Sequence, residues 1–178
     1  MWEIIPTFMG EERLFQQFFY NPMHPFGVRE LSREAGLDTK TVMKYLKNLA
    51  KDNIILKKKN KGHFPHYEAN RGSDTYRIFK STVFIERIAR SGLIDFLREK
   101  LNPKAIVLFG SIQKGTYGER SDIDFFIQGK DKSIDVSFYE KKLGHEIQLH
   151  FEEDMSNLTE GLRSNIINGY TLSGRLSV

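Results

Sequence analysis

The sequence of 178 residues contains no cysteine. Disulfide bonds and thiolate-ligated metal sites are therefore excluded, and the absence fits a cytoplasmic protein. No apolar run approaches the roughly 20 residues that a membrane-spanning helix needs, so we expect no membrane partner. Residues 1–6 lack a basic region followed by an apolar core, so no signal peptide is predicted. With 39% hydrophobic and 28% charged residues, the composition is typical of a globular protein.

The net charge of +4 is distributed unevenly along the chain. Residues 1–90 carry sixteen basic and ten acidic side chains, whereas residues 91–178 carry eleven and thirteen. A basic half joined to a mildly acidic half predicts two domains with different partners.

Apolar spacing near the N-terminus predicts three helices followed by a two-stranded ribbon. Asp38 or Thr39 is placed to cap the third helix, and a lysine-rich turn joins the two strands. This order is typical of a winged helix-turn-helix domain, which we assign to residues 1–72. The expected helices cover residues 12–21, 28–35 and 39–52, and the expected strands cover 54–58 and 63–68.

Residues 28–49 resemble the DNA-reading helix pair of bacterial and archaeal regulators, which implies that the third helix lies in a major groove. Between Lys40 and Lys61 there are eight lysines and one acid, Asp52. Such a run also suits a solvated face or a protein contact, but here it falls on the helix and ribbon that touch DNA in this fold. We expect double-stranded DNA as a partner, bound mostly through phosphates. The expected contacts are Thr39, Lys40, Thr41, Lys44, Lys57, Lys58, Lys59 and Lys61.

A long helix is predicted over residues 73–91 and connects the two domains. Its broad apolar face indicates either a homodimer contact, which we expect, or packing across the domain boundary. In residues 92–178 the apolar side chains recur at helical spacing in some segments and at every second residue, as in strands, in others. The expected helices cover 92–101, 134–143 and 158–167, and the expected strands cover 104–109, 122–128, 145–151 and 171–176.

One stretch of the second domain combines an apolar run, Gly110-Ser111, ten further residues, and then Asp122 and Asp124 at the start of a second apolar run. Residues alternate faces along a strand, so the two aspartates point the same way. Two like charges this close raise each other's pKa unless a cation neutralises them. Carboxylate oxygens suit Mg²⁺, and glycine with serine suits a close phosphate. The pattern therefore predicts a phosphate site beside a metal site, as phosphoryl or nucleotidyl transfer requires.

The stretch closely resembles the motif of the minimal nucleotidyltransferases in the DNA polymerase β superfamily, with Gly115 and Ser121 also in their usual places. The resemblance implies an α+β chain of two domains, in which the winged helix precedes a polymerase-β-like domain with a mixed sheet flanked by helices. It also implies ATP as substrate, with Asp122 and Asp124 holding Mg²⁺ or Mn²⁺. The expected nucleotide-binding residues are Gly110, Ser111, Lys114, Arg120 and Ser121.

The sequence departs from this family at the third carboxylate. Active members carry an acid on the strand expected here at 145–151, where the aligned residue is Gln148. An amide is a poorer Mg²⁺ ligand than a carboxylate and does not offset its charge. Glu146 lies on the same face one pleat earlier, and we expect it to act as the third catalytic acid if the register shifts. His150 shares that face, but imidazole prefers softer metals.

Two functions follow from this departure. The first is an enzyme that transfers an adenylyl group from ATP to an acceptor. The resemblance implies that the acceptor is a tyrosine of a helical toxin partner protein, as for antitoxins of this family, with an antibiotic-type small molecule as the alternative. The second is a regulator that binds DNA and nucleotide without turnover. The two are compatible, because an antitoxin can also repress its own operon.

Overall fold

The computed structural model describes residues 11–59, 62 and 64–177. The chain divides into two compact units after Arg77, inside helix α4 (Asp74–Ser91). The sequence predicts domains at residues 1–72 and 92–178 that are joined by a helix over residues 73–91, and this assignment stays a prediction. Within the described residues, none of the helices combines the length and apolar composition that crossing a membrane requires.

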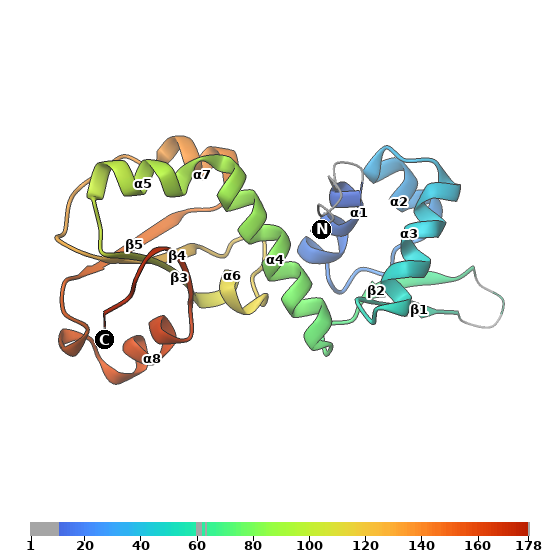
Figure 1. Ribbon diagram of the computed structural model, residues 1–178. Helices are drawn as coiled ribbons and strands as arrows, with labels where there is room; N and C mark the ends of the chain where they lie inside the picture. The colour runs from blue at the N-terminus through green and yellow to red at the C-terminus, as the bar shows by residue number, and fades with distance from the viewer. Residues whose placement is uncertain (1–10, 60–61, 63, 178) are drawn as a thin grey trace, which may run out of the picture. The chain divides into compact units, whose positions relative to one another are not determined.

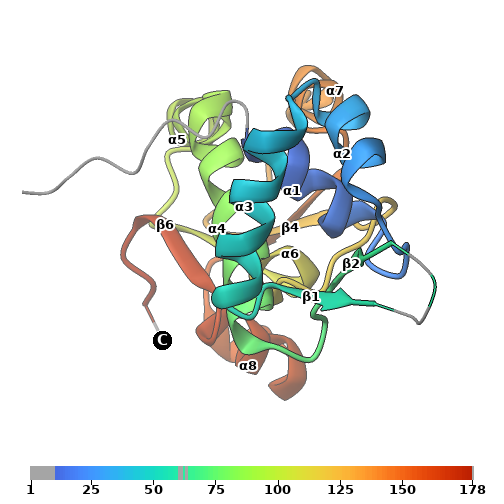
Figure 2. The ribbon, with the colours of Figure 1, turned by 90° about the vertical axis from the view of Figure 1, so that its right-hand side faces the viewer.

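In the described residues of the first unit there are three helices and a two-stranded antiparallel sheet (Figure 2). Asp38 caps α3 by accepting a hydrogen bond from the Thr41 amide at 2.9 Å, as its position in the sequence predicted. Gly36 ends α2 in the left-handed conformation that glycine adopts without strain. The elements are α1 (Glu11–Tyr20), α2 (Val28–Ala35), α3 (Thr39–Lys51), β1 (Ile55–Lys58) and β2 (His66–Ala69).

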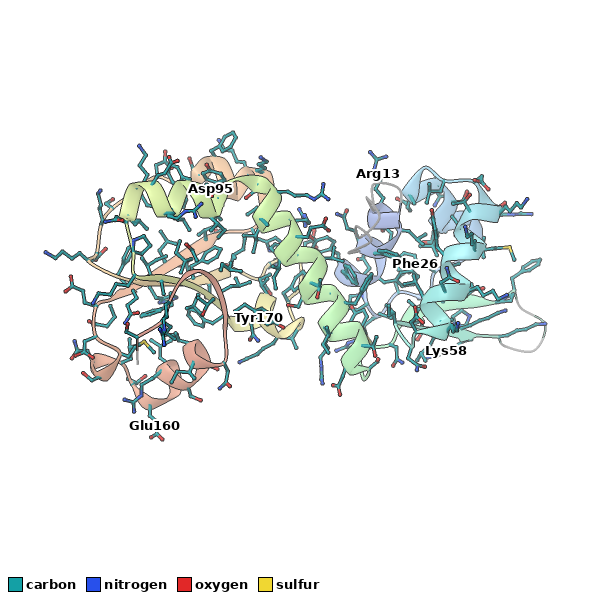
Figure 3. All side chains as sticks on the ribbon, viewed as in Figure 1. Arg13, Phe26, Lys58, Asp95, Glu160 and Tyr170 are labelled. Carbon is teal, nitrogen blue, oxygen red and sulfur yellow. The ribbon has the colours of Figure 1, made fainter. Side chains whose placement is uncertain are left out.

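The core of the first unit is formed by apolar side chains at helical spacing. Leu14, Phe18, Leu31 and Leu46 are at most 1% exposed. Phe26 lies in the loop after α1, is buried, and forms an isolated antiparallel bridge to β2 (Figure 3). The element order agrees with the order expected from the sequence, although β2 begins three residues later than the strand predicted at 63–68. The assignment to the winged-helix fold stays a prediction.

The second unit contains a mixed four-stranded sheet with strand order β5-β4-β3-β6. β3 is antiparallel to both β4 and β6, whereas β4 and β5 are parallel. A mixed sheet flanked by helices is what the sequence predicted. The strands are β3 (Ala105–Phe109), β4 (Ile123–Gln128), β5 (Ile147–Glu152) and β6 (Tyr170–Gly174), and the helices are α5 (Leu93–Leu101), α6 (Gly110–Lys114), α7 (Ser137–Leu143) and α8 (Glu160–Ile167), with a 3₁₀ turn at Met155–Asn157.

Helices cover both faces of this sheet (Figure 1). On one face Val107, Phe109 and Phe126 pack against Ile166 of α8 and Met155 of the 3₁₀ turn. The opposite face, which includes Phe125, lies toward α5 and α7 (Figure 1). All five residues of β3 are buried, which explains their continuous apolar run in the sequence.

Three expectations for this unit need correction. No helix was predicted between residues 110 and 121, but the first five residues of this segment form α6. The helix expected at 134–143 begins only at Ser137, where the amide bonds to the Asp135 side chain. The final helix is divided: Leu158 follows the 3₁₀ turn, and α8 begins at Glu160.

The apolar face of α4 is largely buried within the single chain. Val83, Phe84 and Ile88 are at most 8% exposed, whereas Ile78 is 61% exposed. These three buried residues all belong to the second unit, so this part of the face packs within that unit. The homodimer remains a prediction, and burial of these side chains removes much of the surface on which it was based.

Candidate functional site

The Gly110-Ser111 bend and the acid pair meet at the end of two paired strands. Phe109, the last residue of β3, lies opposite Asp124 of β4. Gly110 has a φ of +76°, and a Cβ atom at this position would lie 2.1 Å from Oδ2 of Asp124. Only glycine therefore allows the carboxylate to lie against the bend. Ser111 follows at the second position of α6 and is half-buried.

The two aspartates affect each other electrostatically. Asp122 directly precedes β4, Asp124 is its second residue, and both are half-buried. Burial raises the pKa of Asp124, the nearby Asp122 carboxylate raises it further, and His150 opposes both effects. The ionised pair is therefore unfavourable by itself and favours a cation. That Asp122 and Asp124 together hold a metal ion stays a prediction.

Strand β5 places an amide, not an acid, beside Asp124. Gln148, the residue that the resemblance aligns with the third acid, is its parallel partner in the β4–β5 register. His150 lies further along the same face, with Nε2 3.8 Å from Oδ1 of Asp124 and its ring centroid 5.4 Å from that of Phe109. The residue opposite Asp124 is thus a neutral side chain, with an imidazole nearby.

Glu146 lies just before β5, where its backbone carbonyl accepts a hydrogen bond from the Ile123 amide at 2.8 Å. Its side chain is exposed. Across the described part of the chain, no group of three or more acidic or histidine side chains is close enough to hold a metal ion. The donor set near the bend is therefore a pair of carboxylates. Such a pair fits Mg²⁺ or Mn²⁺ only if substrate and water oxygens complete the coordination.

The remaining predicted nucleotide-binding residues lie in α6 and the loop after it. Lys114 donates from Nζ to Oδ1 of Asn165 on α8, at 3.1 Å. Arg120 is exposed. The Ser121 hydroxyl accepts a hydrogen bond from the Gly118 amide at 2.9 Å, so Ser121 closes the loop.

Sequence reasoning missed the buried contacts that fix this loop, which are ring packing at Tyr117 and hydrogen bonds to the loop backbone. Tyr117 is 3% exposed and packs edge-on against Phe84 of α4 and against His145. Nδ1 of His145 donates to the Ser121 carbonyl at 2.6 Å, and burial lowers the pKa of this histidine. Lys80 and Ser81 of α4 also bond to this segment. A lysine on the apolar face of the helix predicted at 73–91 was the signal that could have revealed them.

An open hollow of about 540 Å³ lies on the other face of β5. Its lining includes Ile147, Leu149 and Phe151, which alternate with the residues facing Asp124. The hollow therefore forms no part of the acidic site.

Helix α3 carries the basic face that the sequence predicted. Thr39 and Lys40 are exposed, but the Thr41 hydroxyl donates to Asp38 at 2.6 Å and so belongs to the helix cap. The exposed lysines recur at spacings of four, three and four residues, which aligns them along one side of the helix. They are Lys40, Lys44, Lys47 and Lys51.

The ribbon orients its lysines differently. Lys57 and Lys58 are consecutive residues of β1 and point to opposite faces. Nζ of Lys58 lies 2.6 Å from Oε2 of Glu68 on β2, so its charge is partly offset (Figure 3). Lys59 is exposed just after the strand. Lys61 lies outside the described residues, so its expected DNA contact has no structural account.

Comparison with known proteins concerns the second unit. Residues 90–171 match the family model described as a nucleotidyltransferase domain. The match supports the assignment of this part of the chain to the nucleotidyltransferase superfamily. Searches of curated proteins and of solved structures give no match.

Proposed function

We propose that the second unit transfers the adenylyl group of ATP to an acceptor hydroxyl. The observation that carries this proposal is the close approach of the Asp124 carboxylate to Gly110, because an ion held by Asp124 would then lie beside the bend. The match to a nucleotidyltransferase domain supports nucleotidyl transfer as the class of reaction.

Asp122 and Asp124 would hold Mg²⁺ or Mn²⁺ together with phosphate oxygens of ATP. The ion would neutralise charge on the triphosphate and on the leaving pyrophosphate. Gly110 leaves room for the Asp124 carboxylate against the bend. The Ser111 hydroxyl can donate a hydrogen bond to a phosphate oxygen. Lys114 and Arg120 would add positive charge near the triphosphate.

In the proposed reaction, the acceptor oxygen forms a bond to the α-phosphorus. The bond from the α-phosphorus to the bridging oxygen breaks, and pyrophosphate leaves with the electron pair. The exposed Glu146 carboxylate, next to the Asp122 end of β4, would take the proton of the hydroxyl. The protein contributes alignment and charge neutralisation more than covalent chemistry.

A protein hydroxyl, such as a tyrosine of a helical toxin-type partner, is the acceptor we propose. The second unit is a minimal sheet and helix assembly with little additional chain from which to build a small-molecule pocket. The hollow beside β5 opens on the face away from Asp124. A protein acceptor can bind through its own surface around the reacting hydroxyl, so it suits a site with so little chain for a pocket better than a small molecule does.

Transfer can be tested with labelled ATP, Mg²⁺ and the protein encoded by the adjacent gene. We expect label on that protein with the wild type and none with Asp122→Asn. Asp131→Asn, an exposed aspartate in the loop after β4, makes the same charge change away from the bend and should keep transfer. Equal labelling by wild type and Asp122→Asn would contradict the proposal.

A second candidate function is a regulator that binds nucleotide without turnover. It is favoured by Gln148, which occupies the position opposite Asp124 where a third acid would lie. In this case ATP should bind with Mg²⁺, but no label should reach any candidate acceptor.

We also propose that the first unit binds double-stranded DNA. The lysine row on α3 supports this, because four exposed cations along one helix side can follow the phosphates of a groove. DNA binding is compatible with either function of the second unit.

A further inference from the structure

Lys80 is a buried cation in the second unit. It is only 2% exposed and lies one helical turn before Phe84 and two before Ile88, both in the core. A buried ammonium group is unfavourable unless hydrogen bonds and polar contacts offset the loss of water. The contacts of the Lys80 ammonium group therefore show what offsets this cost and indicate the role of the residue. Nζ donates to the carbonyl oxygen of Tyr117 and lies 4.1 Å from the centroid of the Tyr117 ring.

Ser81, the next residue of α4, makes a parallel contact. Its hydroxyl is buried and donates to the carbonyl oxygen of Gln113 at 2.9 Å. Gln113 lies near the end of α6, and Tyr117 lies in the loop that follows. Two successive side chains of one helix thus bond to two backbone carbonyls that are four residues apart.

These carbonyls belong to the segment that joins the bend to the acid pair. Ser111 lies at its start and Asp122 at its end, and the segment includes Gly115 and Gly118, which by themselves leave the backbone conformationally free. The packing of Tyr117 against Phe84 anchors the middle of the segment from the same helix. The β3–β4 pairing holds Asp124 near Gly110. The positions of Ser111 and Asp122, at the two ends of the segment, then depend on how firmly α4 holds it.

We infer that Lys80 and Ser81 are positioning residues of the nucleotide site, acting through the segment 113–121 on the placement of Ser111 and Asp122. This inference rests on the proposed function of the second unit. Neither residue is assigned a contact with substrate. Loss of either hydrogen bond should loosen the segment and weaken binding of the metal–ATP complex.

The test compares Lys80→Met and Ser81→Ala with Val83→Ala in the full-length protein. Lys80→Met keeps most of the apolar stem and removes the ammonium group. Val83→Ala removes buried volume from the same helix, so it controls for general loss of stability. Three quantities are measured: the melting temperature, the dissociation constant of Mg-ATP by calorimetry, and amide hydrogen exchange of residues 113–121.

We expect Lys80→Met to weaken Mg-ATP binding about 10-fold and Ser81→Ala about 3-fold, as loss of one charged and one neutral hydrogen bond implies. Val83→Ala should change binding less than about 2-fold while lowering the melting temperature. Exchange in 113–121 should accelerate in the Lys80 and Ser81 variants beyond its change in Val83→Ala.

The inference is overturned if Val83→Ala, at equal loss of melting temperature, weakens binding and accelerates exchange in 113–121 as much as Lys80→Met does. If Lys80→Met does not fold, the same comparison is made with Ser81→Ala, whose change in volume is small. Failure of the wild type to bind Mg-ATP would overturn the proposed function and this inference together. Wild-type binding without a difference between the variants would overturn the inference alone.

Discussion

At the scale of the residue, Gly110 controls the approach of the bend to the acid pair. We predict that Gly110→Ala destabilises the protein by roughly 2 kcal/mol or more, because its φ is +76° and the added Cβ would overlap the Asp124 carboxylate. Displacement of Asp124 should also weaken Mg-ATP binding more than about 10-fold. Denaturant unfolding and calorimetry measure the two effects.

Gly144→Ala is the matched control for this variant. Gly144 has a φ of +75°, but a Cβ there would meet no atom within 4 Å. The control should therefore lose about 1 kcal/mol from backbone strain alone and retain Mg-ATP binding. If both variants bind Mg-ATP equally well, the contact of Gly110 with Asp124 does not control the site.

Asp124 gives a prediction about stability and pH. Its pKa is raised, chiefly by burial and then by the charge of Asp122, so ionisation costs more in the folded than in the unfolded state. Protonated Asp124 contributes to the free energy of unfolding. This contribution is fully present below the pKa that Asp124 has in the unfolded chain, and it is lost as the pH rises through the higher pKa that Asp124 has in the folded protein. At neutral pH and without metal, Asp124→Asn should therefore raise the melting temperature by roughly a few degrees.

Thermal scans with EDTA and with Mg²⁺ plus ATP measure this effect. Ligand should stabilise the wild type and leave Asp124→Asn nearly unchanged. A lower melting temperature for Asp124→Asn in EDTA would show that the carboxylate is a net stabilising group, and the predicted cost of ionising Asp124 would then be wrong.

At the scale of the element, β5 decides whether the site has a third acid. Gln148→Asp puts a carboxylate opposite Asp124, and we predict that it raises Mg²⁺ affinity in the presence of ATP about 10-fold. Gln148→Asn, which shortens the side chain without adding charge, is the control. Calorimetric titration of metal measures the gain. No gain would indicate that the site already has its full set of ligands, and Glu146 would be the next acid to examine.

The DNA-binding elements differ in their predicted contributions. Neutralising Lys44 and Lys47 on α3 should reduce the slope of log affinity against log salt by about 2, since each phosphate contact contributes about one counterion. Lys58→Gln should reduce it less, because Lys58 is paired with Glu68. A binding titration at several salt concentrations measures the slopes.

The double change of Lys130 and Lys141 to glutamine, in the second unit, is the control for net charge, because both lysines are exposed. Its slope should match that of the wild type. If the salt dependence of affinity is the same for this control and for the variant of Lys44 and Lys47, these two lysines of α3 do not contact DNA.

At the scale of the whole molecule, α4 belongs to both compact units. Tyr76 donates its hydroxyl to the Phe18 carbonyl at 2.9 Å in the first unit. One turn later Lys80 and Ser81 bind the segment after α6 in the second unit. The helix is therefore part of each unit's packing and not a simple linker.

The parts predicted from sequence are those that leave a local pattern. The apolar runs on either side of Gly110 and Asp124 predicted β3 and β4, and alternation predicted β5 and the place of Gln148. Contacts between distant segments leave no such pattern. The bond from Lys80 to Tyr117 spans 37 residues, and the sequence shows only a lysine on an otherwise apolar helix face. The division of the last helix was missed because Leu158 fits the helical spacing although it lies before α8.

The central claim is that Asp122 and Asp124 hold a divalent ion and a triphosphate together against the Gly110-Ser111 bend. Calorimetric titration of ATP into the full-length protein tests it most directly, with Mg²⁺ and with EDTA, for the wild type and for the double variant Asp122→Asn/Asp124→Asn. We predict that EDTA and the double variant each weaken ATP binding at least about 10-fold. ATP affinity that is the same with and without metal, or the same in the double variant, would contradict the claim.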